Sequence, residues 1–173
     1  MNQALIISDS HGMTKEVDTI KKRHSLDLMI HCGDSELDMD APILDNFIKV
    51  GGNCDFDSRY PNDQFFTVGG LSFFVTHGHL YGVKEGLTRI SYKADEMGAQ
   101  VICFGHTHVA GAIKQGNQLF INPGSIRLPR RRQERTYAII EWDEGFQHVQ
   151  VSFYDMDGSL VPEMTYQTTL NGN

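Results

Sequence analysis

Residues that can bind metal, namely histidine, aspartate and asparagine, occur in short blocks at five places in this sequence, each beside at least one glycine. The five blocks are DSH at 9–11, GD at 33–34, GNCD at 52–55, HGH at 77–79 and GHTH at 105–108. Imidazole, carboxylate and amide oxygen together suit divalent ions such as manganese, iron, zinc, cobalt or nickel. Any single block has an ordinary explanation, because aspartate and asparagine also favour turns and helix N-caps. Five blocks in one short chain instead predict a metal centre.

Each block is preceded by an apolar run that is typical of a buried strand. These runs lie at 4–8, 26–32, 42–52, 65–77 and 101–104. In α/β sheets the carboxyl ends of the strands meet at one edge, which is where ligands bind. We therefore expect the five blocks to share one crevice at that edge.

The pattern between the blocks predicts an α/β fold. Residues 13–24 and 85–98 have apolar side chains at helical spacing, with Gly98 as the expected C-cap. Glycines 69–70 predict a hairpin, and the segments after residue 109 alternate like antiparallel strands with turns at 116–117 and 144–145. We predict a single domain, residues 1–173, built as a two-sheet β-sandwich flanked by helices. Periodicity does not fix the strand order.

The five blocks contain more ligand-type side chains than one ion needs, since a closed structural zinc site takes about four. Seven ligands with one shared carboxylate suit two ions about 3.5–4 Å apart. Two divalent ions carry about +4, which two aspartates and a bridging hydroxide reduce to about +1. Such a centre would attract a phosphate ester, although the chain has a formal net charge of -7.

In this order, D-x-H, G-D, G-N-x-D, H-G-H and G-H-T-H resemble the calcineurin-like metallophosphoesterase superfamily. The short chain and the G-N-C-D form resemble its small prokaryotic phosphodiesterase branch, which is related to the scaffold subunit of retromer. The resemblance runs from residue 4 to about residue 126 and includes N-P-G-S at 122–125. It implies a two-sheet sandwich flanked by helices (the αββα arrangement), in agreement with the periodicity.

The resemblance also implies a role for each ligand. The implied assignment is Asp9, His11 and His108 for the first ion, Asn53, His77 and His106 for the second, and Asp34 as the bridge. It implies two divalent ions per chain and favours manganese, while the ligand types also accommodate nickel, zinc, iron or cobalt.

One position departs from the family pattern. The protein-phosphatase branches have a histidine after the asparagine of the G-N block, where it is thought to protonate the leaving group, and this chain has Cys54. Three possibilities stay open for that step: protonation by His79, tuning of a neighbouring group by Asp55, or protonation by a metal-bound water. We list His79 and Asp55 as the candidate catalytic residues.

A basic run, RLPRRR at 127–132, follows the N-P-G-S block. Charge runs usually form solvated loops. The alternatives are an arm that contacts phosphate and a contact between subunits. Arg127 is nearest to the N-P-G-S turn, so Arg127 and Asn53 are the residues that we expect to contact the substrate.

The other histidines and the cysteines have simpler interpretations. His31 lies within an apolar run and is expected in the core, whereas His24 and His148 are expected at the surface. Cys32 and Cys103 flank strand ends and are expected to be small buried side chains. The three cysteines form no C-x-x-C pair, which favours reduced thiols.

The predicted function is hydrolysis of phosphate diesters by a hydroxide that bridges two divalent ions. Two alternatives stay open: a metal-dependent phosphomonoesterase, and a protein-binding scaffold that has the fold without the chemistry. A scaffold need not keep all seven ligands, and all seven are present, which favours an enzyme. A chain of 173 residues has no room for a large cap domain, so we expect an open site.

The composition restricts the partners. The acidic balance disfavours nucleic acid and anionic membranes, which attract basic surfaces. The sequence starts directly with a strand-like run, without the pattern of a signal peptide or a run of about 20 apolar residues. We therefore expect a cytoplasmic protein that acts on a small phosphate ester. A homo-oligomer is compatible with the sequence, which does not fix the assembly.

Overall fold

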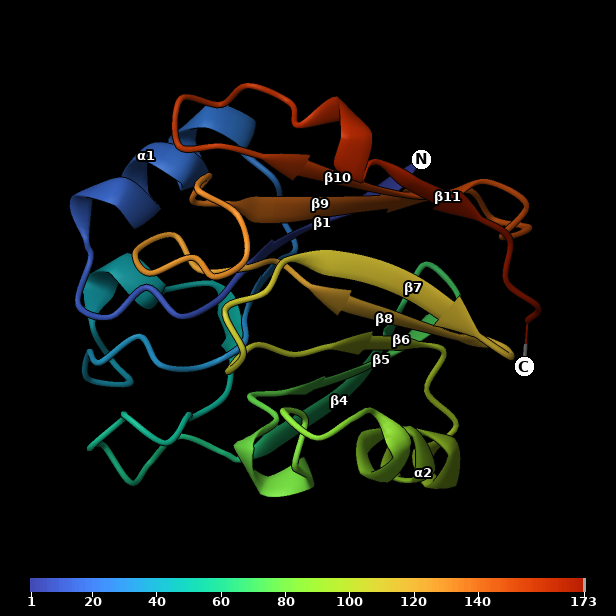
Figure 1. Ribbon diagram of the computed structural model, residues 1–173, viewed down its shortest axis with the longest axis horizontal. Coiled ribbons are helices and arrows are strands. Elements are labelled where there is room, and N and C mark those ends of the chain that lie inside the picture. Colours follow the sequence, from blue (N-terminus) through green and yellow to red (C-terminus); the bar gives the residue numbers. More distant parts are fainter. Residues whose placement is uncertain (173) are drawn as a thin grey trace.

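Two β-sheets pack face to face in this protein, and an α-helix covers the outer face of each sheet (Figure 1). The structure is a computed structural model that describes residues 1–172, so Asn173 of the predicted domain lies outside the described residues. The strand order is β11-β10-β9-β1-β2-β3 in the first sheet and β4-β5-β6-β8-β7 in the second. The predicted two-sheet sandwich flanked by helices is confirmed.

The first sheet combines strands from both ends of the chain. Its strands are β1 (Asn2–Ile7), β2 (Met29–His31), β3 (Phe47–Lys49), β9 (Tyr137–Trp142), β10 (Val149–Tyr154) and β11 (Tyr166–Thr168). Strands β1, β2 and β3 run parallel, whereas β9 pairs antiparallel with β1. The carboxyl ends of β1, β2 and β3 therefore reach the same edge of the sheet.

The second sheet repeats this arrangement. Its strands are β4 (Asp63–Val68), β5 (Leu71–Thr76), β6 (Val101–Cys103), β7 (Gly111–Gln115) and β8 (Gln118–Asn122). Strands β5, β6 and β8 run parallel, and antiparallel strands β4 and β7 close the two sides. The predicted turns at 69–70 and 116–117 are confirmed as the β4–β5 and β7–β8 connections.

The central strands, such as β1, β5 and β6, are buried on both faces because each packs against a second layer on either side. Alternate residues of a strand point to opposite sides, so Ile6 of β1 faces Phe73 of β5 in the core between the sheets. Its neighbour Ile7 points outward and packs against Ile20 of α1 (Lys15–His24). Helix α2 (Thr88–Met97) covers the second sheet in the same way through Ile90.

Three element boundaries differ from the prediction for local reasons. Helix α2 begins after Gly86, whose φ of +147° is not helical, and ends at the expected cap Gly98 with φ +75°. Helix α1 begins two residues later than expected, at Lys15. The run at 42–52 contains only the three-residue strand β3, because Pro42 starts a short 3-10 turn (Pro42–Leu44). Further 3-10 turns are His79–Tyr81 and Pro162–Met164.

Both α-helices are ten residues long, and within residues 1–172 no helix has the length and apolar character needed to cross a bilayer.

Candidate metal centre

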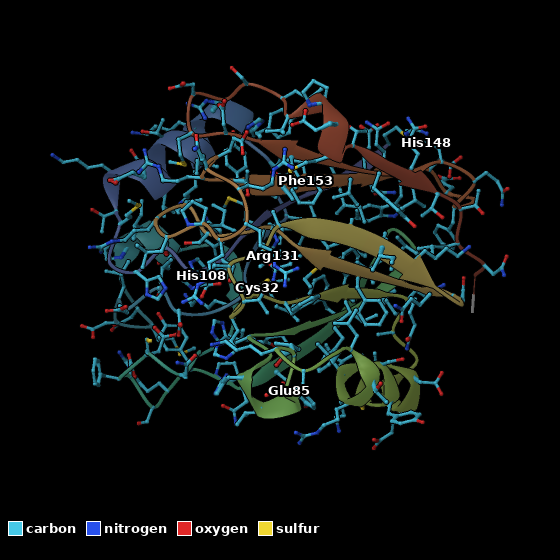
Figure 2. The ribbon with its side chains drawn as sticks, in the orientation of Figure 1. Cys32, Glu85, His108, Arg131, His148 and Phe153 are labelled. Carbon is cyan, nitrogen blue, oxygen red and sulfur yellow. The ribbon has the colours of Figure 1, made fainter. Side chains whose placement is uncertain are left out.

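The loops that follow β1, β2, β3, β5 and β6 meet at one edge of the sandwich, where His108 lies (Figure 2). Ligand atoms of Asp9, His11 and His108 all lie within 4.8 Å of one another, and so do those of Asp9, Asp34 and His77. Asp9 belongs to both groups. The structure thus brings together residues from four of the five sequence blocks around one buried carboxylate.

Asp9 lies at the middle of this cluster and is fully buried. Its Oδ2 accepts a hydrogen bond from the backbone N–H of His106 at 3.1 Å. Its Oδ1 lies 3.1 Å from Nε2 of His108 and 3.8 Å from Nε2 of both His11 and His77, yet has no well-formed hydrogen bond. Because a buried carboxylate oxygen without a partner is costly, this atom is suited to bind a cation.

Three histidines present the same nitrogen to Asp9, since each uses Nδ1 to bond an oxygen. These bonds join His11 to Glu36 Oε1 at 2.6 Å, His77 to the Cys32 carbonyl at 2.8 Å and His108 to the Leu128 carbonyl at 2.7 Å. Carbonyl and carboxylate oxygens only accept, so Nδ1 donates and Nε2 is left to face the centre. Metal-binding imidazoles are oriented in the same way.

Asp34 and Asn53 also approach Nε2 of His77. Asp34 Oδ2 is 3.2 Å and Asn53 Oδ1 is 3.1 Å from His77 Nε2. The Asn53 amide donates to Cys54 Sγ at 3.6 Å, and the Cys54 N–H donates to Asp34 Oδ1 at 2.9 Å. The oxygens of Asp34 and Asn53 and the Nε2 of His77 therefore point toward one place, as the ligands of a single ion must.

The G-H-T-H block, which already supplies His108, also contributes His106 at the border of the cluster. Its ring centroid is 5.1 Å from that of His77 and 6.1 Å from that of His79. Burial, together with the positive charges of His77 and Lys84, lowers the pKa of His106 to about 4. Its imidazole is therefore neutral near pH 7, which is the form that binds metal.

The carboxylates and histidines stabilise each other's charges. Burial opposes ionisation of Asp9 and Asp34, but the close imidazoles of His108 beside Asp9 and of His77 beside Asp34 lower the pKa of both carboxyls below the usual range. Conversely, the Asp9 carboxylate raises the pKa of His108, and Asp34 raises that of His77 against the effect of burial. Two negative charges therefore persist at neutral pH in a buried place, which favours a bound cation.

Two glycines permit this close approach. A Cβ on Gly52 would overlap Asp34 Oδ1, and a Cβ on Gly105 would overlap Ser8 Oγ and Asp9 Oδ2. Only glycine therefore fits at these two positions.

Five of the seven predicted ligands have a left-handed backbone, a conformation that is unfavourable for residues other than glycine. Their φ angles are +53° at Asp9, +41° at His11, +57° at Asp34, +69° at His106 and +60° at His108. Strained backbone of this kind is typical of functional sites.

Several supporting residues could not be found from the sequence pattern. Glu36, three residues after Gly33, fixes His11. Ser125 of the N-P-G-S block donates from Oγ to the Asp9 carbonyl at 2.7 Å. His31 is buried as predicted; it also accepts from the Gly33 N–H and bonds Ser10 Oγ at 2.8 Å, which ties two site loops together.

Asp55 supports the loops around the centre instead of facing it. Its Oδ2 accepts the backbone N–H groups of Asp34 and Gly52 at 2.8 and 2.7 Å, and its Oδ1 accepts that of Glu36 at 2.8 Å. These three bonds favour the tuning role over direct contact with a substrate.

Replacing Asp55 by asparagine is expected to weaken Mn²⁺ binding by about 10-fold or more. The amide must turn an N–H₂ group toward at least one backbone N–H, so that the loop holding Asp34 shifts. Titration calorimetry on the metal-free protein measures the effect. The exposed Asp27→Asn serves as the control, and equal affinity of Asp55→Asn and wild type contradicts the positioning role.

The other predicted residues lie at the rim. His79 is half-buried, with its ring centroid 5.4 Å from that of His77 and its Nδ1 buried without a hydrogen bond. The Arg127 guanidinium donates to the His11 carbonyl, beside the centre. Burial and the charge of Asp34 raise the pKa of Cys54 to about 11, so this thiol stays protonated at neutral pH.

His24, expected at the surface, is partly exposed. Its Nε2 bonds Tyr137 Oη at 2.7 Å because the last turn of α1 rests on β9. His148 is partly exposed and pairs with Glu141 at 3.0 Å.

Known proteins have similar sequences and the same fold. Residues 3–145 match the calcineurin-like phosphoesterase superfamily domain. A probable metallophosphoesterase of Bacillus subtilis, YsnB, is 48% identical over 168 residues, which cover 96% of this chain and 98% of that protein. The phosphodiesterase YfcE of Escherichia coli is 30% identical over 105 residues, 56% of this chain and 53% of YfcE.

A solved structure gives the same result. The crystal structure of a predicted phosphoesterase from Streptococcus pneumoniae superposes with a TM-score of 0.92 at 33% identity and covers 97% of both chains. Together with the domain match over most of the chain, this similarity leads to one conclusion. The chain belongs to the calcineurin-like phosphoesterase superfamily.

Proposed function

We propose that this protein is a phosphodiesterase that uses two divalent metal ions per chain. The observation that carries the proposal is the convergence of three Nε2 atoms on the buried, unpartnered Oδ1 of Asp9. If the cluster only stabilised the fold, its buried carboxylate charge would have no cation to balance it. A cation bound among these atoms would satisfy the carboxylate and the imidazoles at the same time.

The two proposed ligand sets share one carboxylate, that of Asp34. The first set is Asp9, His11 and His108, the second is Asn53, His77 and His106, and Asp34 contributes to both. Imidazole and carboxylate ligands fit manganese, our leading choice, and also nickel, zinc, iron or cobalt. Two such ions, when bound, lower the pKa of water and neutralise charge on phosphate oxygens.

The chain's own residues would then hold and orient the ester. The guanidinium of Arg127 donates to the His11 carbonyl, which places an exposed positive charge beside the centre. Asn53 and His79 both lie beside His77, and His79 has a buried Nδ1 without a hydrogen bond, so its ring can turn its other nitrogen to an ester. We assign Arg127, Asn53 and His79 to substrate contact, whereas Asp55 acts through the loops that it holds.

The choice of diesters over monoesters is supported by the name of the relative YfcE, a phosphodiesterase. A phosphate diester has one negative charge and a monoester about two at neutral pH, so the two substrates can be separated in a direct comparison. The complete ligand set supports an enzyme over a scaffold of the same fold.

The test is hydrolysis of bis(p-nitrophenyl) phosphate and of p-nitrophenyl phosphate by protein stripped of metal and refilled with Mn²⁺, Ni²⁺, Zn²⁺ or Mg²⁺. We expect cleavage of the diester only after refilling, and a higher kcat/KM for the diester than for the monoester. Preference for the monoester overturns the diester assignment. Metal binding without cleavage of either ester overturns the enzymatic proposal and leaves the scaffold.

A further inference from the structure

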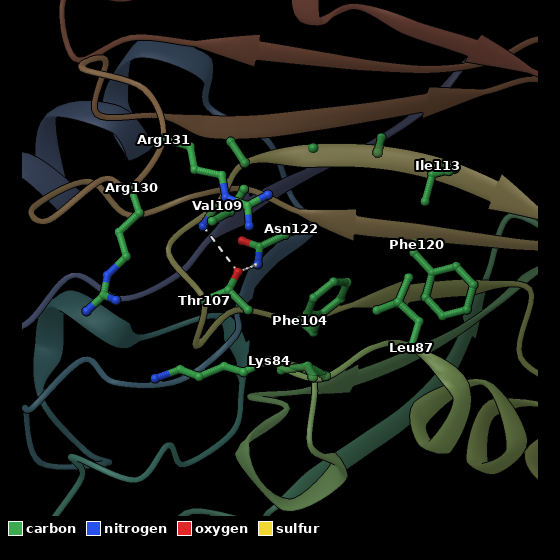
Figure 3. A pocket seen from close by; sticks show the side chains of 14 residues that line it. Lys84, Leu87, Phe104, Thr107, Val109, Ile113, Phe120, Asn122, Arg130 and Arg131 are labelled. Atoms are coloured by element: carbon green, nitrogen blue, oxygen red, sulfur yellow. Dashed lines mark hydrogen bonds between the residues drawn. The ribbon is translucent and has the colours of Figure 1, made fainter.

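A pocket of about 640 Å³ lies beside the metal centre, between the segment before α2 and strands β7 and β8 (Figure 3). Ligand pockets in proteins commonly measure about 300–1,000 Å³. Most of its lining is apolar: Val83, Leu87, Phe104, Val109, Ile113 and Phe120. Its volume and lining suit an organic group larger than a single phosphate.

The pocket shares a wall with the metal centre. Thr107, which lines the pocket, lies between the predicted ligands His106 and His108. The Asn122 side chain fixes it by donating to Thr107 Oγ1 at 2.9 Å. Arg130, another lining residue, donates its backbone N–H to the His108 carbonyl at 3.0 Å. A molecule with its phosphate at the centre can therefore place a second group in the pocket.

Three cations border this apolar lining: Lys84, Arg130 and Arg131. Among the described residues, none of the three forms an ion pair, whereas Arg132 in the same loop pairs with Glu163 at 2.6 Å. Figure 3 shows the charged ends of Lys84 and Arg130 directed to the same end of the pocket. Unpaired cations around a concave surface attract an anion, even though the chain as a whole is acidic.

We infer that this pocket binds the non-leaving arm of the substrate, and that this arm combines an aromatic group with a negative charge beyond the scissile phosphate. The inference rests on the proposed function. The apolar lining, which includes the ring of Phe104, matches a flat apolar group. The three unpaired cations exceed the single charge of a simple diester, so they match an additional anionic group.

Three esters with the same p-nitrophenolate leaving group test this inference. Their second arms are methyl, phenyl and 4-carboxyphenyl, so that the leaving-group chemistry stays constant while the arm changes. With the Mn²⁺-loaded enzyme, kcat/KM is expected to rise about 10-fold from methyl to phenyl, through burial of apolar surface. It is expected to rise again for 4-carboxyphenyl, and only this second gain falls at high salt.

Variants separate the two contributions. Ile113→Thr, at a partly exposed position of β7, is expected to reduce the advantage of phenyl over methyl. The double variant Lys84→Met, Arg131→Met is expected to remove the advantage of the carboxylate and to leave the methyl ester unaffected. Arg135→Met is the matched control, because Arg135 is exposed in the same loop and does not line the pocket.

A binding measurement distinguishes failure of this inference from failure of the proposed function. Mn²⁺-loaded protein is titrated with methylphosphonate, phenylphosphonate and 4-carboxyphenylphosphonate, none of which has an ester bond to cleave, with and without the Lys84 and Arg131 substitutions. Tightest binding of the third compound, lost in the double variant, supports the pocket even if no diester is cleaved. Equal kcat/KM for all three esters, or equal binding of the three phosphonates, overturns the inference.

Discussion

Replacing Asp34 by asparagine is expected to reduce diester hydrolysis by about 10³-fold or more, because the substitution removes one of the two carboxylate charges proposed to hold the metal ions. The change keeps the size of the side chain, and the amide oxygen can still accept the Cys54 N–H at the position of Oδ1. The loss therefore reports the missing negative charge. Initial rates with bis(p-nitrophenyl) phosphate at saturating Mn²⁺ measure it.

A second readout separates loss of metal from loss of fold. Elemental analysis after gel filtration is expected to show fewer than two Mn²⁺ per chain in Asp34→Asn and two in wild type. The circular dichroism spectrum of the variant should match that of wild type. Asp157→Asn, on the exposed surface, is the control and should retain full activity. Wild-type activity of Asp34→Asn would exclude Asp34 as the bridging ligand.

Replacing Phe73 by alanine is expected to lower the free energy of unfolding by about 3–5 kcal/mol, the usual cost of deleting a buried ring. Phe73 is completely buried between the sheets. Its ring centroid lies 5.0 Å from that of Phe66 and 5.4 Å from that of Trp142. The cavity would open where the two sheets meet. Urea denaturation of the metal-free protein, followed by Trp142 fluorescence, measures the change.

Phe56→Ala removes the same ring from an exposed position, where the side chain has a relative accessibility of 96%. Its effect on stability is expected to stay within about 0.5 kcal/mol. The pair of variants compares identical chemistry at opposite burial. If both variants unfold at the same urea concentration, the core between the sheets is not what stabilises the protein.

The parallel strands and their polar ends could be predicted because each depends on a short local pattern. An apolar run followed by a block such as G-H-T-H indicates both a strand and what lies at its carboxyl end. The meeting of the blocks then follows from the parallel direction of β1 and β2 in one sheet and of β5 and β6 in the other. No long-range information was needed for that step.

The strand order could not be predicted, because alternation does not identify a strand's partner. Strand β8 lies between β6 and β7, and β9 returns to pair with β1 at the other end of the chain. The role of Asp55 was hidden for a similar reason. Its three acceptor bonds go to backbone N–H groups of residues up to 21 positions away, and periodicity carries no information about such contacts.

At the five candidate ligands with a left-handed backbone, the residue that would be most stable differs from the residue that could bind metal, so selection for stability and selection for activity favour different residues. Each such residue costs about 1–2 kcal/mol relative to an ordinary conformation, whereas glycine adopts it without strain. Selection for heat resistance alone would favour glycine at His11 or His108. Only selection that also requires the ligands retains them, so thermostable descendants of this protein obtained without an activity screen would tend to lose the centre first.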